Sequence, residues 1–186
     1  MPAINTTQTA FNGKLAEQFL AVISALSDHF GLSVPPIVEI DDLRSRPVGS
    51  FGRAWADNLD MNGLKPLTSG LRRQQLHDGL HVLTGYGTDP LGEAEVQAFL
   101  LGAKFRWVHG VLALALLRGW MRQYWHAHKQ QPQSLFQALS ETVWPRLWQA
   151  YLRGQNCLLD PDAWEPELLW DLPLEVVRDR FGLSQP

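Results

Sequence analysis

Two histidines four residues apart, His77 and His81, are the side chains of this sequence best suited to metal chemistry. On a helix, residues at this spacing project from one face, so both imidazoles can reach the same ion. Asp78 lies about 100° around the helix from His77, where it can complete the ligand set or orient a ligand. Glu93 falls in the first turn of the next predicted helix, where exposed N–H groups favour an ionised carboxylate. A hairpin of these two helices would bring Glu93 to the histidines.

This donor set indicates which metals to expect. Mixed nitrogen and oxygen ligands favour Zn, Fe or Mn, whereas Mg, which prefers oxygen and water ligands, is a less suited option. Fewer than six protein ligands leave a position for water or substrate, as a catalytic site requires. The alternative interpretation is structural: the two histidines would be boundary residues beside a leucine stripe, and Glu93 an ordinary helix-start residue.

The elements that must position these residues are helical. Apolar residues recur at helical spacing through most of the chain, and Gly and Pro interrupt the pattern. The predicted helices cover residues 13–30, 50–61, a segment capped by Thr68 or Ser69 and ended at Gly85, a segment from Asp89-Pro90 to about Lys129 with interruptions near Gly102 and Gly110, 134–154 with a kink at Pro145, and 173–181. The sequence contains no alternating strand pattern and no repeat. We therefore predict an all-α fold, a single-domain irregular bundle of about six or seven helices over residues 1–186, with residues 1–12 flexible.

Composition excludes several classes of protein. The chain has 186 residues, 45% of them hydrophobic, which describes a globular protein rather than a disordered or coiled-coil one. Its formal charge of −3 provides no basic field for phosphate backbones, so nucleic acid is not an expected partner. The single cysteine, Cys157, makes no internal disulfide, which indicates a reducing compartment.

The sequence indicates contact with a membrane surface at most, rather than a segment that spans the bilayer. The longest apolar run, from Val111 to Leu117, is far short of the roughly 20 residues that span a bilayer. The N-terminus has neither a secretory nor an organellar targeting pattern, so we expect a cytoplasmic protein. Between residues 117 and 129, one predicted helix face carries Arg118, Arg122, Trp125 and Lys129. This face is either an ordinary solvated surface or a contact with lipid head groups.

The motif around the histidines resembles a known family. The Coq-four family of coenzyme Q biosynthesis proteins carries His-Asp-x-x-His, eleven residues and then Glu, and this pattern fits His77, Asp78, His81 and Glu93 without a gap. The similarity extends over about residues 44 to 182. Further segments similar to the family are Gly49-Ser50-Phe51-Gly52-Arg53-Ala54-Trp55-Ala56, the turn 85–89, Ala150-Tyr151-Leu152-Arg153-Gly154, and 170–178.

The resemblance implies a metal held by His77, Asp78, His81 and Glu93, which would also be the catalytic residues. It implies a lyase-type role in ubiquinone biosynthesis on polyprenylated benzoate intermediates, with loss of the C1 carboxylate coupled to ring hydroxylation. Because the sequence shows no organellar presequence of the kind that eukaryotic members carry, we expect a bacterial-type protein, peripherally associated with the inner face of the membrane. A lipid ligand, other quinone-biosynthesis proteins and a second copy of the chain are the expected partners.

Two rival functions remain open from the sequence. The first is a non-catalytic polyprenyl-lipid-binding or scaffold protein that organises quinone-biosynthesis enzymes at the membrane. The second is an HD-type phosphohydrolase, because His77-Asp78 is an adjacent His-Asp pair. That class needs a further upstream His and downstream Asp, for which His29 and Asp89 are the available residues.

Overall fold

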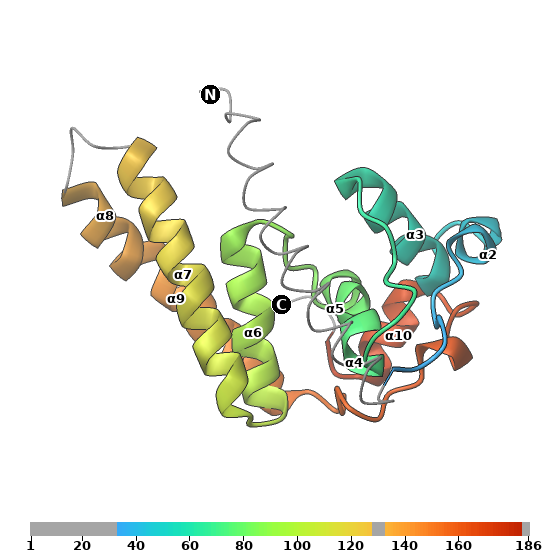
Figure 1. The fold of residues 1–186 in the computed structure, drawn as a ribbon. Coiled ribbons are helices and arrows are strands. Elements are labelled where there is room, and N and C mark those ends of the chain that lie inside the picture. The colour runs from blue at the N-terminus through green and yellow to red at the C-terminus, as the bar shows by residue number, and fades with distance from the viewer. Residues whose placement is uncertain (1–32, 128–132, 184–186) are drawn as a thin grey trace. The chain divides into compact units, whose positions relative to one another are not determined.

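The structure, a computed structural model, describes residues 33–127 and 133–183. Over these two ranges the chain forms helices and connections, and the pairing of Ser50 with Pro173 is an isolated bridge rather than a strand. The predicted all-α fold is therefore confirmed (Figure 1). The helix predicted over 13–30 and the flexible segment 1–12 lie outside the described residues. The chain divides into two compact units, one of residues 1–39 and 66–76 and one of residues 40–65 and 77–186.

The first unit is organised by the buried side chain of Gln75, the last residue of the short helix α4 (Arg72–Gln75). Its amide nitrogen donates to the carbonyl oxygens of Val34 and Pro35, at 3.0 and 3.3 Å. Its amide oxygen accepts from the backbone N–H of Ile37 at 2.9 Å. The side chain thus satisfies backbone groups that the Pro-rich segment cannot pair in a helix or sheet.

In the second unit, helices α2 (Ile40–Ser45), α3 (Phe51–Asn62) and α10 (Leu174–Arg180) surround a core of aromatic side chains. The core aromatics with ring centroids 5.3–6.2 Å apart are Phe51, Trp55, Trp164 and Trp170. The N–H groups of Phe51 and Gly52 donate to the carbonyls of Leu172 and Trp170. Helix α3 begins after its cap Ser50 and ends before Gly63 in the left-handed conformation, so each end lies one residue later than in the predicted helix 50–61.

A helical hairpin follows in this unit. Helix α5 (His77–Thr84) ends at Gly85, whose φ of 77° stops the helix, and α6 (Pro90–Ala103) begins after its cap Asp89. The cap and the Pro at the first helical position were both predicted. The predicted cap at Thr68 or Ser69 was wrong, because the chain becomes helical only at Arg72 and is interrupted again at Leu76.

The helices after α6 differ in two places from the prediction. The break falls at Lys104–Arg106, and α7 (Trp107–Ala127) then runs through Gly110 without interruption. The segment predicted to kink at Pro145 divides into α8 (Gln133–Ala138), the π-helical turn η1 (Leu139–Val143) and α9 (Trp144–Asn156). The distortion therefore precedes the proline, whose missing N–H falls in the first turn of α9 where it costs little. In these described parts the chain has more helical segments than predicted, because these irregularities divide the periodic stretches and because α2 and a 3₁₀ turn at Pro166–Leu168 were not predicted.

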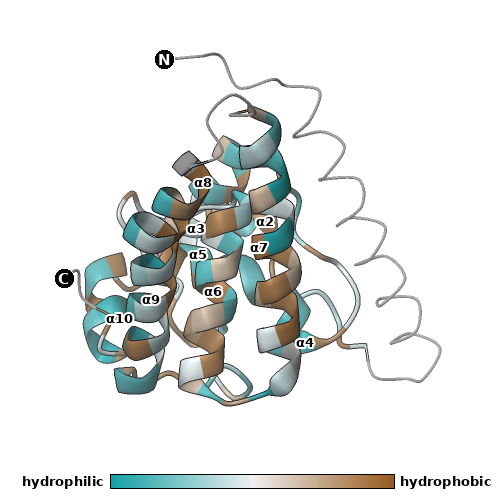
Figure 2. Ribbon diagram, turned by 90° about the vertical axis from the view of Figure 1, so that its left-hand side faces the viewer, coloured by the Kyte–Doolittle hydropathy of each residue, from teal (hydrophilic) through white to brown (hydrophobic). Residues whose placement is uncertain are grey.

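Helices α6, α7 and α9 pack together, with α6 contacting both others (Figure 2). A Cβ on Gly102 of α6 would overlap the carbonyl of Tyr151, and a Cβ on Gly154 of α9 would overlap the carbonyl of Phe99. The two glycines thus let the backbones of α6 and α9 approach closely. Among the helices that the structure describes, none has the length and hydropathy that crossing a bilayer requires.

Candidate metal centre

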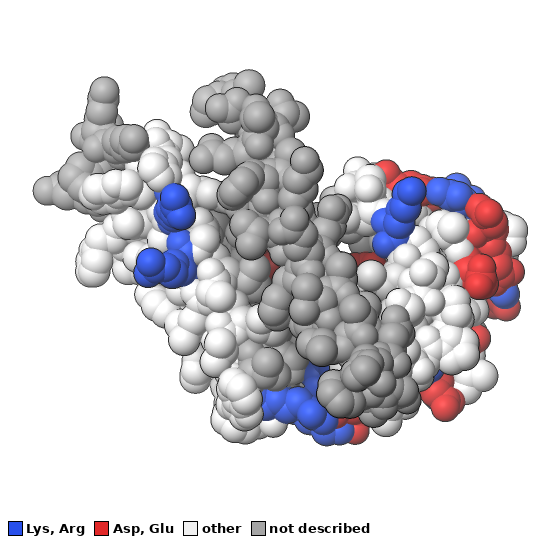
Figure 3. Space-filling view, viewed as in Figure 1, with Lys and Arg blue, Asp and Glu red and all other residues white. Residues whose placement is uncertain are grey.

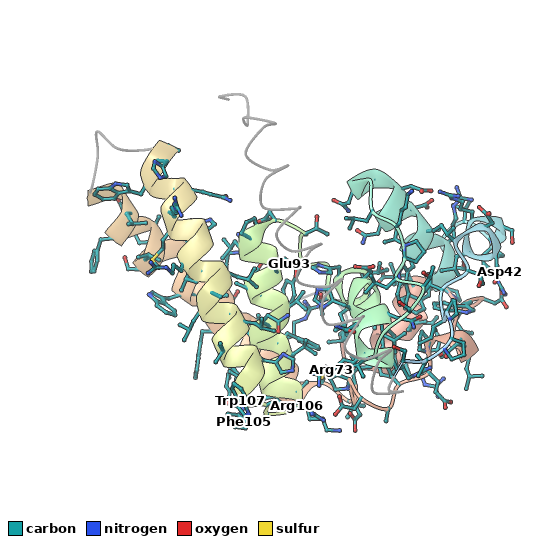
Figure 4. The ribbon with its side chains drawn as sticks, in the orientation of Figure 1. Asp42, Arg73, Glu93, Phe105, Arg106 and Trp107 are labelled. Carbon is teal, nitrogen blue, oxygen red and sulfur yellow. The ribbon has the colours of Figure 1, made fainter. Side chains whose placement is uncertain are left out.

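The hairpin of α5 and α6 brings three of the four predicted ligands together. The Nε2 atom of His77 lies 3.0 Å from Oε2 of Glu93, and Nε2 of His81 lies 3.2 Å from Oε1 of the same carboxylate. The two Nε2 atoms are 3.2 Å apart. One donor atom from each residue lies within 4.8 Å of the others, so a single ion placed among them would be reached by all three. Figure 4 shows Glu93 near the start of α6.

The ring of His81 has a second contact that fits metal binding. Its Nδ1 lies 3.1 Å from the backbone carbonyl oxygen of Tyr86. A carbonyl only accepts, so this contact requires the proton on Nδ1 and leaves the lone pair of the neutral ring on Nε2, which faces His77 and Glu93. Metal-bound histidines commonly have this arrangement. The donor set therefore fits a divalent ion with nitrogen preference.

In the absence of an ion, a proton shared among the histidines and Glu93 occupies the place that a metal ion would take. Burial acts to raise the pKa of Glu93, but the hydrogen bonds and charges of His77 and His81 lower that pKa to about 2. Burial acts to lower the pKa of His81, yet the Glu93 carboxylate raises it above its ordinary value of 6.5. Without an ion, a proton on His81 thus neutralises Glu93. A divalent cation would replace that proton.

Asp78 lies beside this group but outside it. Its carboxylate is not among the three donors that converge. Burial is the main reason that its pKa is raised, with Glu93 adding to the rise and the two histidines opposing it. Asp78 directly follows His77 in the chain, and its roles as fourth ligand or orienting group both remain predictions.

The centre has a closed side and an open side. The side chain of His81 is 1% exposed, whereas those of His77 and Glu93 are 30% and 28% exposed. A ligand would therefore approach past His77 and Glu93, while His81 forms the inner wall.

Asp89, the residue that a phosphohydrolase would need as a further ligand, accepts hydrogen bonds from the N–H groups of Leu91 and Gly92 as a helix cap. His29, its proposed companion, lies outside the described residues.

Helix α5 packs against the aromatic core at Gly79, which lies between His77 and His81. Gly79 lies directly against the indole of Trp55, and a Cβ at this position would overlap the ring. Trp55 itself is fully buried. The glycine between the two histidines thus has a packing reason: it lets α5 lie close to α3.

The C-terminal end of α5 is closed by two arginines that the sequence interpretation did not single out. Arg178 donates to the carbonyl oxygens of Leu83 and Val82, at 3.1 and 2.9 Å. Arg153 donates to the carbonyl oxygen of Thr84 at 2.7 Å and to that of Leu183 at 2.8 Å. Positive charge at a helix C-terminus complements the helix dipole and satisfies carbonyls that lack helical partners. A sequence signal exists only in retrospect, since both arginines lie in segments that carry the family resemblance.

Known proteins of ubiquinone biosynthesis are similar to this chain in sequence. The mitochondrial ubiquinone biosynthesis protein COQ4 homolog of Bos taurus is 29% identical over 171 residues, and that of Mus musculus is 28% identical over 175 residues. The chain resembles the COQ4 proteins of ubiquinone biosynthesis. Each alignment covers 80% of this chain and 56% of the COQ4 homolog, so the chain spans about half the length of these relatives. No protein-family model matches the chain.

A solved structure shares the fold. The crystal structure of a candidate ubiquinone biosynthesis protein from Nostoc punctiforme superposes with a TM-score of 0.56 and 22% sequence identity. The match covers 82% of this chain and 71% of the other. The all-α architecture described above is therefore found in an experimentally determined protein.

The segments that carry the COQ4 resemblance meet at α5. Residues 49–56 supply Trp55 against Gly79, residues 150–154 supply Arg153, and residues 170–178 supply Arg178. The turn 85–89 supplies the carbonyl that orients His81 and the cap that begins α6. These four segments, three of them distant from α5 in sequence, all support the helix that presents the two histidines.

Proposed function

We propose that this chain is a metal-dependent protein of ubiquinone or related isoprenoid-quinone biosynthesis. The observation that supports the proposal is the convergence of His77, His81 and Glu93, with Nδ1 of His81 anchored on a carbonyl and Nε2 left for a ligand. The resemblance to COQ4 homologues supplies the pathway. In this proposal His77, His81 and Glu93 hold a divalent ion, Zn, Fe or Mn before Mg, and Asp78 completes or orients the set.

We further propose the reaction that the resemblance implies, loss of the C1 carboxylate of a polyprenylated benzoate coupled to hydroxylation at that carbon. A bound divalent ion would supply Lewis-acid stabilisation of the negative charge that develops as the carbon–carboxylate bond breaks. The exposed edges of His77 and Glu93 would border the entry for the head group, and buried His81 would exclude water from the inner side. Hydroxylation also needs a two-electron oxidant, for which we propose dioxygen: with one water consumed, the carboxylate leaves as carbon dioxide, the ring carbon gains a hydroxyl group and dioxygen is reduced to hydrogen peroxide.

Turnover by the purified, metal-loaded protein tests the proposal. The assay supplies a polyprenylated hydroxybenzoate and dioxygen, and mass spectrometry follows release of the carboxylate and gain of oxygen. We expect His77→Ala to lose bound metal and turnover together. The matched control is His126→Ala, which removes an exposed histidine of α7 and should change neither. Full activity of His77→Ala without bound metal would refute this function.

A second candidate function, a non-catalytic lipid-binding or scaffold protein at a membrane, is favoured by the surface of α7. One face of this helix is exposed along its length and carries Trp107, Val111, Leu114, Arg118, Arg122 and Trp125. Helix α7, residues 107–127, contains Arg118 and Arg122 and no Asp or Glu. Figure 3 shows basic and no acidic side chains over α7 on the face in view. An exposed apolar and basic helix face suits an anionic membrane surface.

In this second candidate the protein lies peripherally on the cytoplasmic face of a membrane and collects other quinone-biosynthesis proteins or a second copy of itself. Cosedimentation with vesicles containing anionic lipid tests the surface. Because each basic residue near such a surface contributes about 1 kcal/mol, reversing Arg118 and Arg122 to Glu should abolish most binding. Tight lipid binding without turnover by the metal-loaded protein would favour the scaffold over the enzyme.

A further inference from the structure

Arg153 differs from the other arginine at the end of α5 in one respect. Arg153 and Arg178 each donate two hydrogen bonds to backbone carbonyls, and each caps the last turn of the same helix. Only Arg153 also contacts the turn that follows. Its guanidinium carbon lies 5.5 Å from the centre of the Tyr86 ring, within the range of a cation–π contact.

Tyr86 is the residue whose carbonyl oxygen accepts from Nδ1 of His81. The turn that holds this carbonyl is short, running from Gly85 at the end of α5 to the cap Asp89. The Tyr86 N–H reaches the Thr84 hydroxyl only at 3.4 Å, a long contact. The ring of Tyr86 contacts both the Arg153 guanidinium and the ring of Phe99, whose centroid is 6.5 Å away. The side chain of Tyr86, more than its backbone N–H, thus fixes the position of its carbonyl.

We propose that Arg153 is a positioning residue for the metal centre: by holding the Tyr86 ring and the last carbonyl of α5, it fixes the Tyr86 carbonyl and thereby the ring orientation of His81. This inference rests on the proposed metal site for its consequence, because His81 binds an ion through Nε2 only when Nδ1 keeps its proton on that carbonyl. Arg153 itself touches neither the ion position nor a substrate, so its effect passes through Tyr86.

A comparison of Arg153→Met with Arg178→Met tests the inference, since each variant removes two hydrogen bonds to backbone carbonyls, one of them on α5 for Arg153 and both for Arg178. Groups that orient metal ligands typically change affinity by about 10- to 100-fold. We expect Arg153→Met to weaken Zn²⁺ binding about tenfold, near the lower end of that range, and Arg178→Met to weaken it less than about twofold. Competition with a chromogenic chelator measures both constants. Equal weakening by the two variants, or none by Arg153→Met, would overturn the inference.

Two further variants test the route through Tyr86. Tyr86→Leu keeps the carbonyl but removes the ring beneath the guanidinium, and it should weaken Zn²⁺ binding to a similar extent. Adding Arg153→Met to Tyr86→Leu should then cost little more, because both changes release the same carbonyl. Independent, additive losses would contradict the route. Arg153→Lys, which keeps the charge but not the planar group, serves if Arg153→Met does not fold, and wild-type affinity in Arg153→Lys would count against the inference.

A measurement without metal separates failure of this inference from failure of the proposed function. Nitrogen-15 NMR of the imidazoles, recorded at a pH where they are neutral, reports which ring nitrogen of His81 carries the proton. We expect a lower fraction of the Nδ1–H form in Arg153→Met than in the wild type or Arg178→Met. If the wild-type protein bound no Zn²⁺, the proposed function would fail and this tautomer shift would still decide the role of Arg153. An unchanged tautomer would remove that role even if Zn²⁺ bound.

Discussion

The α5–α6 hairpin and helix α7 belong to the same compact unit but differ in which side chains they bury and which they expose. The hairpin removes polar groups from solvent and gives them partners, as with the two histidines, Glu93 and the carbonyls at the end of α5. Helix α7 instead leaves aromatic and aliphatic side chains in solvent, and Figure 4 shows Phe105, Arg106 and Trp107 at its beginning, at the opposite end of α6 from Glu93.

Each region departs from the usual distribution of side chains: the hairpin buries polar groups, and α7 exposes apolar ones. Burying polar groups costs free energy unless they are paired, and an extended apolar surface on a soluble protein indicates contact with something else. The comparison indicates two roles in different parts of the fold. The hairpin holds the candidate metal ligands in fixed positions, and the exposed face of α7 suits contact with a membrane surface. Substitutions in the hairpin should therefore lower stability or metal binding, whereas truncation of exposed apolar side chains on α7 should lower neither appreciably.

The largest effect expected is loss of the core contact beneath α5. Trp55→Ala removes a fully buried indole and should lower the free energy of unfolding by about 3–5 kcal/mol. Urea unfolding followed by circular dichroism measures the loss. A loss below about 1 kcal/mol would show that α5 does not depend on this core.

Gly79→Ala is expected to have the next largest effect. The added methyl group would overlap the Trp55 ring, and overpacking of this kind costs about 1–3 kcal/mol. The matched control is Gly119→Ala on α7, where nothing lies within 4 Å of an added Cβ. That change should stabilise the protein by about 0.5–1 kcal/mol, because Ala is the better helix former. Thermal unfolding of both variants sharpens the comparison, and shifts of the same sign would break it.

Metal affinity should depend on pH through His81. Its raised pKa means that the folded protein holds this proton more tightly than the unfolded chain does. In the metal-free protein the resulting stability is fully present below about 6.5 and is lost as the pH rises through the raised pKa. Metal must displace this proton, so Zn²⁺ affinity should increase with pH up to that pKa, by at most about tenfold per unit.

Glu93 should contribute little to this dependence near neutral pH. Its pKa of about 2 keeps the carboxylate ionised throughout the range in which His81 titrates. Calorimetric titration with Zn²⁺ at a series of pH values measures both the affinity and the proton released. A pH-independent affinity would contradict the assignment of His81 as a ligand.

The smallest effect is expected for an equally large side chain on α7. Trp107 is 74% exposed, so Trp107→Ala should change the free energy of unfolding by no more than about 0.5 kcal/mol. Zn²⁺ affinity should also remain unchanged. Paired with Trp55→Ala in the same denaturation experiment, this variant tests whether the two regions differ as described; a loss comparable to that of Trp55→Ala would remove the distinction.

Local signals in the sequence were enough to predict the hairpin. The four-residue spacing of His77 and His81 placed them on one face, and Asp89-Pro90 marked the start of α6, so the approach of Glu93 followed from a short connection. The role of Asp78 did not follow, because a position on the flank of a helix fits a ligand and an orienting group equally well.

Features that depend on contacts between distant segments could not be predicted from the sequence. The contacts of Arg153 and Arg178 with α5 span 69 and at least 95 residues of chain, and no local pattern encodes them. The position of the break at Lys104–Arg106 and the π-helical turn before Trp144 were not predicted, because hydrophobic periodicity alone does not specify where a helix becomes irregular. The aromatic residues show the same limit: Trp55 and Trp107 look alike in sequence, yet one is buried and the other exposed.

The most direct test of the central claim is the metal content of the chain and of one matched pair of variants. After equilibrium dialysis against Zn²⁺, elemental analysis should find about one ion per chain in the wild type. Glu93→Gln removes the charged donor and should lose the ion, whereas Glu141→Gln, which neutralises an exposed carboxylate accepting from Gln137, should retain it. A wild type without bound metal, or Glu93→Gln with a full complement, would contradict the account.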